Sequence, residues 1–392
     1  MKNVNFISAI FLLVMTGCGG NRQAGNDTEG FITVDVTKNY SPQKELILQD
    51  FMDVEYIALE TKKDFYNQGF VQTLGEKVIL VKNRVDDGDI FVYDRNGKCL
   101  RKFNRKGQGP EEYTFILGIA LDEDNGEMFV NDHSSKKIVV YDLYGNFKRS
   151  FKHKEGGGSL FYTDIFNYDR DNLICYDAYN KEIAFVLVSK QDGSITKEIH
   201  IPFKEKKAAI ARMRDEKSGM TYAMTPGPYR SIIPFNGNWL LAELSTDTIF
   251  RFLPDYSLCP FLVRTPSIQS MNPEEFLYLR LLSDRYYFME TIRNVYDFDS
   301  RRGFDRTFFM YDKQENAILG YTVYNGDYLI KKELYMNALR PVNHEIESWQ
   351  RIDADQLVED YEKGVLKGKL KEIAASLKEE DNPVIMLVKH KK

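Results

Sequence analysis

Asp89-Ile-Phe-Val-Tyr-Asp-Arg-Asn-Gly97 and Lys137-Ile-Val-Val-Tyr-Asp-Leu-Tyr-Gly145 are two copies of one pattern. In each copy an alternating strand ends in a polar turn, and a second strand follows. The turn glycines Gly97, Gly145 and Gly193 succeed one another at intervals of 48 residues. A repeat of this length built only from strands is typical of a β-propeller, in which each repeat forms one blade.

The composition supports an all-β globular fold. The chain has 392 residues, of which 43% are hydrophobic and 13% aromatic, mostly Phe and Tyr. Phe and Tyr favour half-buried strand positions. A net charge of −5 gives no electrostatic basis for binding nucleic acid. We therefore predict a six-bladed β-propeller of four-stranded blades over residues 31–392, with a short C-terminal helix and with N- and C-terminal strands that close the ring.

The strand patterns predict the order of the blades. We expect residues 54–59 to begin the first blade, and residues 31–36 to pair with 383–388 in completing the sixth. A helix is expected to start at Asn272, which can cap it, and another to lie within residues 354–378, where Gly364 and Gly368 weaken it. Residues 202–229 form a long insertion without a strand pattern, and such insertions are usually functional or disordered.

The N-terminus resembles a bacterial lipoprotein signal. A short charged start precedes a mostly apolar run and Met15-Thr-Gly-Cys18. The run is too short to span a bilayer, so residues 1–17 are predicted to be a signal peptide. Cleavage would leave Cys18 as a lipidated N-terminus, and residues 18–30 have the composition of a flexible tether. An ordinary secretory signal with a chance cysteine is the alternative. Met15 is a departure from the lipoprotein signal, which usually has Leu or another aliphatic residue at this position.

Three segments carry a resemblance to a known family: Asn104-Arg-Lys-Gly-Gln-Gly-Pro-Glu-Glu-Tyr113, Ser245-Thr-Asp-Thr-Ile-Phe-Arg251 and Glu380-Asp-Asn-Pro-Val-Ile385. With the Asp89 pattern, they are similar to the six-bladed β-propeller lipoproteins of Bacteroidota, relatives of NHL-type propellers. The resemblance implies the fold and a location in the cell envelope. It implies no catalytic residues.

The loop that follows the first blade is the main candidate ligand site. It joins two blades, and such loops gather on one face of a propeller near the channel mouth. Ligand contacts are therefore assigned to five residues of this loop and to one arginine elsewhere: Arg105, Gln108, Glu111, Glu112, Tyr113 and Arg230. The alternative for the loop is a structural turn, in which glycines adopt unusual angles and a Glu caps backbone amides. For Arg230 the alternative is solvated loop charge.

Other patterns point away from metals and cofactors. The acidic segments 122–126 and 297–300 lack EF-hand spacing and fit turn chemistry better. The five histidines are scattered, so no metal site and no cofactor are predicted. A Ser-His-Asp triad stays open, because triads assemble in space. Arg212, Arg214, Arg301 and Arg302 can bind acidic sugars or be solvated, and the tyrosines of 278–296 can stack sugars or fill the core.

Two functions follow from different classes of protein. The first is a lipid-anchored envelope protein that presents its loop face to a glycan, a peptide or a partner protein. The alternative is a hydrolase or lyase acting on a carbohydrate or lactone, with carboxylates at the channel mouth as acid and base. A third possibility is a purely structural part of the envelope. The sequence leaves catalytic residues unassigned.

Overall fold

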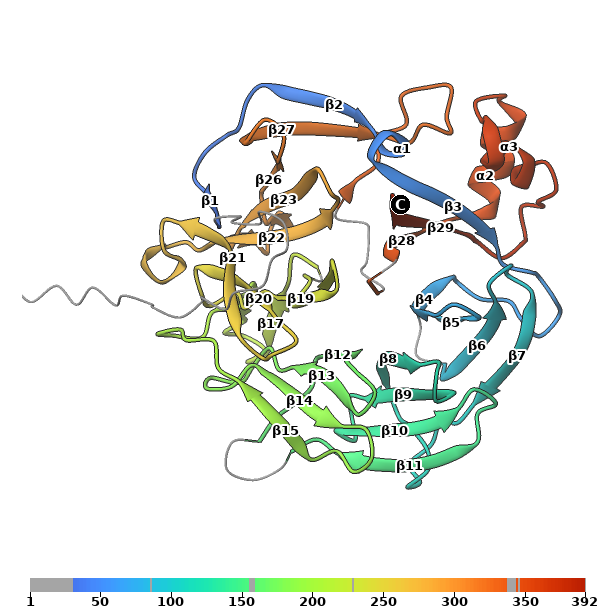
Figure 1. Cartoon of the computed structure of the whole chain (residues 1–392), viewed down its shortest axis with the longest axis horizontal. Coiled ribbons are helices and arrows are strands. Elements are labelled where there is room, and N and C mark those ends of the chain that lie inside the picture. The colour runs from blue at the N-terminus through green and yellow to red at the C-terminus, as the bar shows by residue number, and fades with distance from the viewer. Residues whose placement is uncertain are drawn as a thin grey trace, which may run out of the picture. The chain divides into compact units, whose positions relative to one another are not determined.

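The computed structural model describes residues 31–84, 87–154, 159–227, 229–336, 343–344 and 346–391. The predicted signal peptide, the predicted tether and Cys18 lie outside these residues. Within the described part of the chain, six sheets are arranged as blades around a central axis (Figure 1). The prediction of an all-β, six-bladed propeller is confirmed.

The first three blades each contain four antiparallel strands in sequence order from the axis outward. Their strands are β4 (Phe70–Leu74), β5 (Val78–Lys82), β6 (Asp89–Asp94) and β7 (Cys99–Asn104); β8 (Ile116–Asp122), β9 (Glu127–Asp132), β10 (Lys137–Asp142) and β11 (Phe147–Lys152); and β12 (Asp164–Asn167), β13 (Asn172–Tyr176), β14 (Phe185–Ser189) and β15 (Ile195–Ile199).

The fourth and fifth blades each add an outer parallel strand to four antiparallel ones. The fourth contains β18 (Ile232–Phe235), β19 (Asn238–Leu241), β20 (Thr248–Phe252), β21 (Leu258–Thr265) and β1 (Ile32–Asp35). The fifth contains β22 (Glu275–Leu282), β23 (Tyr286–Arg293), β26 (Arg306–Asp312), β27 (Ala317–Tyr324) and β2 (Gln43–Ile47). Lys44 on β2 forms an ion pair of 2.9 Å with the buried Asp312, which fixes β2 to this blade.

The ring closes in the sixth blade, whose described strands are β28 (Ile346–Ile352), β29 (Val384–His390) and β3 (Met52–Ala58). Strand β3 pairs antiparallel with β29, so the two ends of the propeller meet there. The closing strand is therefore not residues 31–36, and residues 54–59 do not begin the first blade. A closing strand needs apolar side chains on both faces: Tyr56 packs into one core cluster and Ile57 into another. Strand β1 buries only Val34, which suits an edge.

The repeated glycines hold the turns between the two outer strands of a blade. Gly97, Gly145 and Gly193 have φ values of +81°, +83° and +75°. A Cβ at Gly145 would lie 2.7 Å from the ring of Phe103, and one at Gly193 would lie 2.3 Å from the ring of Phe151. The glycine therefore serves both the left-handed turn and close packing on the outer strand of the preceding blade. This shared role accounts for the constant spacing.

The helices are short. Within the described residues they are α1 (Leu48–Phe51), η1 (Ile268–Ser270), α2 (Ala354–Glu362) and α3 (Gly368–Ala374). The predicted C-terminal helix is present but divided, and Gly364 lies in the break with a φ of +67°. The helix predicted at Asn272 is wrong, because the apolar run from Glu275 forms β22 and pairs with β23.

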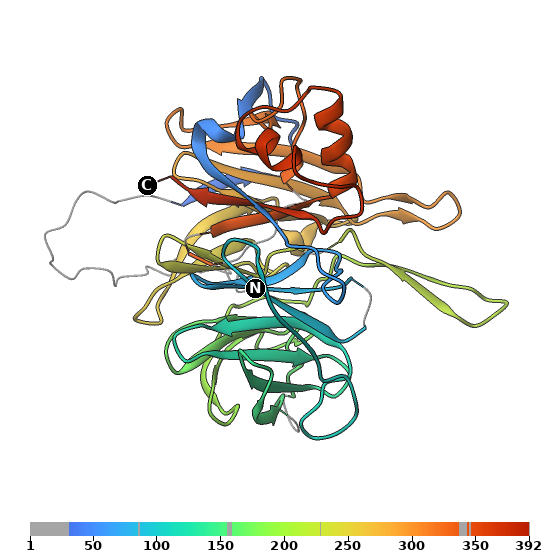
Figure 2. The same ribbon diagram turned by 90° about the vertical axis from the view of Figure 1, so that its right-hand side faces the viewer.

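The insertion at 202–229 contains a hairpin of β16 (Ala211–Arg214) and β17 (Thr221–Met224). A smaller hairpin of β24 (Tyr296–Asp297) and β25 (Arg302–Gly303) belongs to the fifth blade. Figure 2 shows two long hairpins extending from the same side of the blades, and residues from the bases of both share one core cluster. The expectation that the insertion lacks strands is therefore wrong.

Candidate functional site

A cavity of about 1570 Å³ lies among the innermost strands. Several blades contribute to its wall: Thr73 from β4, Ile119 from β8, Asp164 from β12 and Arg280 from β22. Ring closure places these residues together although they are far apart in the sequence. Concave cavities lined by both apolar and polar side chains are the usual sites of ligand binding in proteins.

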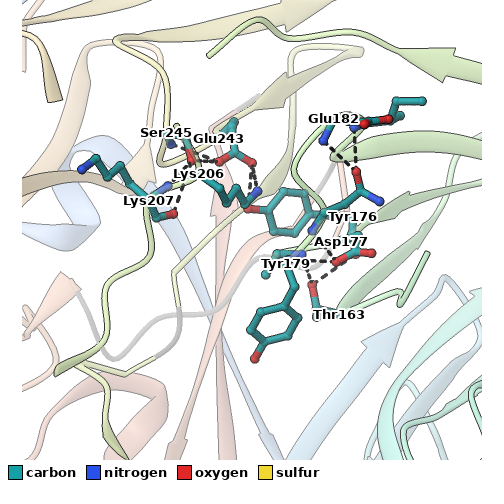
Figure 3. Close-up of polar contacts among 12 residues, drawn as sticks. Thr163, Tyr176, Asp177, Tyr179, Glu182, Lys206, Lys207, Glu243 and Ser245 are labelled. Atoms are coloured by element: carbon teal, nitrogen blue, oxygen red, sulfur yellow. Dashed lines mark hydrogen bonds and ion pairs between the residues drawn. The ribbon is translucent and has the colours of Figure 1, made fainter. Parts of the chain in front are cut away.

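A buried polar network lies beside the cavity, where the insertion meets the third and fourth blades (Figure 3). The carboxylate of Glu243 accepts hydrogen bonds from Tyr176 at 3.0 Å and Ser245 at 2.7 Å, and forms an ion pair with Lys206 at 2.8 Å. Tyr229 donates a hydrogen bond to the Tyr176 hydroxyl. Burial and the neighbouring Tyr229 and Glu243 raise the pKa of Tyr176 well above its ordinary value. Both phenols thus remain neutral donors, and the charge of Glu243 is compensated.

Asp164 is a carboxyl group in the cavity wall whose acidity is strongly altered. It begins β12 and accepts a hydrogen bond of 3.0 Å from the hydroxyl of Ser231. Burial raises the pKa of Asp164 to about 7, although the hydrogen bond from Ser231 acts in the opposite direction. A carboxyl group with this pKa is present in both protonation states near neutral pH. It can therefore donate or accept a hydrogen bond from a ligand.

Four aromatic rings form a row along the rim of the second and third blades. Ring centroids lie 5.6 Å apart for Phe115 and His133, 5.0 Å for His133 and Phe161, and 6.3 Å for Phe161 and Tyr179. His133, Phe161 and Tyr179 also line the cavity. Tyr179 is 65% exposed. The row is therefore an accessible aromatic surface that leads into the cavity.

One carboxylate positions the inner end of this aromatic row. Asp177 accepts hydrogen bonds from the backbone N–H of Phe161 at 2.7 Å and of Tyr179 at 2.8 Å. Phe161 follows the second blade and Tyr179 belongs to the third, so Asp177 joins two loops. In Figure 3 the ring of Tyr179 points away from this turn. The ring is thus presented by a fixed backbone.

Of the residues predicted to bind ligand, Arg230 alone lines the cavity. Its side chain is buried rather than solvated, and it donates a hydrogen bond of 2.9 Å to the Ser348 hydroxyl. Arg212 and Arg214 are exposed on the β16–β17 hairpin, and Arg301 and Arg302 are exposed on the β24–β25 hairpin.

The loop of residues 105–113 packs against the second blade, and none of its residues lines the cavity. Glu112 accepts a hydrogen bond of 2.8 Å from the backbone N–H of Gly109. Tyr113 is fully buried, donates to the carbonyl of Gly88 at 2.6 Å and accepts from the N–H of Arg105 at 3.0 Å. Glu112 and Tyr113, two of the five loop residues predicted to contact a ligand, thus form hydrogen bonds within the turn region.

The other three loop residues remain near the surface. Arg105 donates to the carbonyl of Gly145 at 3.2 Å, and the carbonyl of Glu111 accepts from Tyr141 at 2.5 Å. The side chains of Arg105, Gln108 and Glu111 are exposed. A ligand role for these residues stays a prediction, at a place separate from the cavity wall.

Sequence reasoning missed Asp164, the Glu243 network and the aromatic row. Tyr278, Tyr286 and Tyr287, from the tyrosine-rich run, are buried in the core. Among the described residues, no three His, Cys, Asp or Glu side chains gather as metal ligands. None of the described helices has the length and apolar character needed to cross a membrane.

The fold and the cavity define the class of protein: a six-bladed β-propeller with a central cavity lined by polar and aromatic side chains. Residues 31–389 match a family described as a domain of unknown function, DUF4934. The chain belongs to this family.

One solved structure shows the same fold, and a second is more distantly similar. A candidate exported protein from Bacteroides fragilis NCTC 9343 is 14% identical with a TM-score of 0.57, and the match covers 93% of this chain and 100% of that one. A member of the duf4221 family from Bacteroides vulgatus is 10% identical with a TM-score of 0.46, covering 87% and 99%. The family match over residues 31–389 and the Bacteroides fragilis structure confirm the resemblance to Bacteroidota propellers. Among curated proteins, none matches this sequence.

Proposed function

We propose that this protein is an exported binding protein of the cell envelope that takes a glycan into its central cavity. The proposal rests on one observation: rings of the aromatic row, Asp164 and Arg230 line the same cavity. Sugars place their C–H faces on aromatic rings, while their hydroxyl groups need donors and acceptors such as carboxyl, guanidinium and phenol groups. The cavity offers both kinds of contact within one wall.

The envelope location rests on two observations. The N-terminal sequence resembles a lipoprotein signal that ends at Cys18, and a structure of the same fold is described as a candidate exported protein. Lipidation of Cys18 is tested by labelling cells with an alkyne fatty acid. The proposal expects label on the full chain and none on the Cys18→Ser variant, whereas equal label on both would overturn the anchor.

A glycan array probed with the purified full chain in detergent tests the ligand class. Tyr179→Ala should lose most of the signal from any glycan that binds. Tyr144→Ala is the matched control, because Tyr144 is 70% exposed in the turn between β10 and β11 and does not line the cavity. Loss of signal in both variants, or in neither, would contradict binding in the cavity.

A second candidate function is hydrolysis or elimination on a carbohydrate, and Asp164 favours it. Its pKa of about 7 suits a general acid or base at neutral pH. Glu243 is a poor second carboxylate, because Lys206, Tyr176 and Ser245 already engage it. Incubation with array-positive glycans should then release product with the wild-type chain and not with Asp164→Asn. Binding without product supports the first proposal.

A further inference from the structure

The β16–β17 hairpin, residues 211–224, is largely exposed, and we name it the hairpin arm. All four residues of β17 are exposed, and β16 alternates between half-buried and exposed. Figure 2 shows the arm in yellow-green, extending away from the blades. A two-stranded hairpin is marginally stable by itself, and a third strand is the usual addition that stabilises it.

The base of the arm is fixed to the propeller. Ala209 and Ala211 pack against the cluster that contains Phe276 and Phe304. Arg306 donates a hydrogen bond to the carbonyl of Pro226, just after β17. The arm therefore leaves the body at a defined place, while its outer part has solvent on both faces.

The strand register gives the arm two chemically different faces. Met213 lies opposite Tyr222 and Ala211 opposite Met224, and directly opposed residues share a face. Tyr222 is 46% and Met224 42% exposed, so this face is apolar and accessible. Methionine-rich surfaces adapt to varied apolar partners.

The second face is basic. Arg212 lies opposite Ala223, and Arg214 lies opposite Thr221. The small residues on β17 leave room for both guanidinium groups to reach across that strand. Among the described residues, neither guanidinium forms an ion pair, so both are available to carboxylates of a partner.

We propose that the hairpin arm binds an extended segment of a partner protein as a third β-strand along β17, and that this segment alternates apolar and acidic residues. Successive side chains of a strand point to opposite faces, so one set meets Tyr222 and Met224 while the other meets Arg212 and Arg214. A polypeptide can satisfy the open backbone edge of β17, whereas a lipid surface cannot. The inference is independent of the ligand in the cavity.

Fluorescence anisotropy with labelled ten-residue peptides tests the arm on the full chain in detergent. The probes are alternating Val-Glu, alternating Val-Lys, and a block peptide of five Val followed by five Glu. We expect alternating Val-Glu to bind at least tenfold more tightly than either of the others. Equal affinity for all three, or no binding of any, would overturn the proposal.

Charge reversal supplies the sharper test. The double variant Arg212→Glu with Arg214→Glu should prefer Val-Lys over Val-Glu. Arg301→Glu with Arg302→Glu, on the neighbouring β24–β25 hairpin, is the matched control and should retain the original preference. If both double variants behave alike, the arm does not determine the specificity and the proposal fails.

The variant Tyr222→Ser with Met224→Ser tests the apolar face and should weaken Val-Glu binding at least tenfold. Two other occupants of the arm, a second copy of this chain and a membrane, would give different results. If these substitutions instead abolish a concentration-dependent dimer, the arm joins two copies of this chain. If Arg212→Glu with Arg214→Glu abolishes binding to vesicles of phosphatidylglycerol and phosphatidylethanolamine while peptide binding is unchanged, the arm faces a membrane. Either result overturns the proposal.

Discussion

The loop of residues 105–113 and the cavity rim of residues 161–179 carry similar side chains but use them differently. In the loop, Tyr113 is buried, and its hydroxyl donates a hydrogen bond to the Gly88 carbonyl and accepts one from the Arg105 N–H. At the rim, Tyr179 is exposed and its backbone, not its side chain, is fixed by Asp177. A conspicuous motif can therefore mark a turn whose polar groups bind one another, whereas the rim leaves aromatic side chains open to solvent on a fixed backbone.

The largest expected effect is in the loop. Tyr113→Ala removes a fully buried ring and its two hydrogen bonds. We expect the free energy of unfolding to fall by about 3 to 5 kcal/mol, as in other deletions of buried aromatic rings. Urea denaturation measures this loss. Glycan binding by the fraction that stays folded should be unchanged. A loss of binding with normal stability would instead assign the ligand contacts to the loop.

The next effect concerns the network that supports the rim. Glu243→Gln leaves the nearly buried Lys206 without its counter-charge, and we expect a loss of about 3 kcal/mol. Replacing both residues, Lys206→Met with Glu243→Gln, should restore part of that stability in the same urea assay. If the double variant is less stable than Glu243→Gln alone, the contacts of Lys206 with the rings of Tyr176 and Phe203 contribute more than its ion pair with Glu243.

Tyr179→Ala should affect binding rather than stability. The ring is exposed, so the unfolding midpoint should stay within experimental error. Loss of one stacking contact should weaken glycan binding about tenfold, which corresponds to about 1.4 kcal/mol. Titration calorimetry on an array-positive glycan measures the change. A fall in stability without a change in affinity would assign Tyr179 to the core instead.

A separate expected effect is a pH dependence of stability from Asp164. Its pKa is about 7 in the folded state, above the ordinary value near 4, so its stabilising contribution is present at low pH and is lost as pH rises through 7. Between pH 5 and pH 8 the urea midpoint of the wild type should fall relative to that of Asp164→Asn. If the urea midpoints of the two proteins change in parallel with pH, the pKa of Asp164 is instead near that of an exposed carboxyl group.

Much of the fold could be predicted because it depends on local, repeated signals. Gly97, Gly145 and Gly193 recur because each turn meets the outer strand of the preceding blade, and that contact repeats through the first three blades. The strand that closes the ring was harder to predict, because β1 and β3 have similar strand patterns in the sequence. Only β3 is buried on both faces, and that burial is visible in the structure alone. The hairpin arm was missed because its alternation is short and combines methionine with arginine.

The cavity site was largely beyond sequence reasoning. Asp164, Tyr179 and Arg230 come from different blades or loops, and no spacing connects them. Their residue types are ordinary in strands and turns. One available signal was the polar residue at the start of an inner strand, as at Asp164, because inner strands face the axis of any propeller.

Hydrogen–deuterium exchange of the full chain, with and without the strongest array-positive glycan, tests most directly whether ligand enters the central cavity. We predict slower exchange in the backbone of residues 161–179 and 229–231 when the glycan is bound, and unchanged exchange in residues 105–113. Protection confined to residues 105–113 would contradict the account and return the ligand site to the loop.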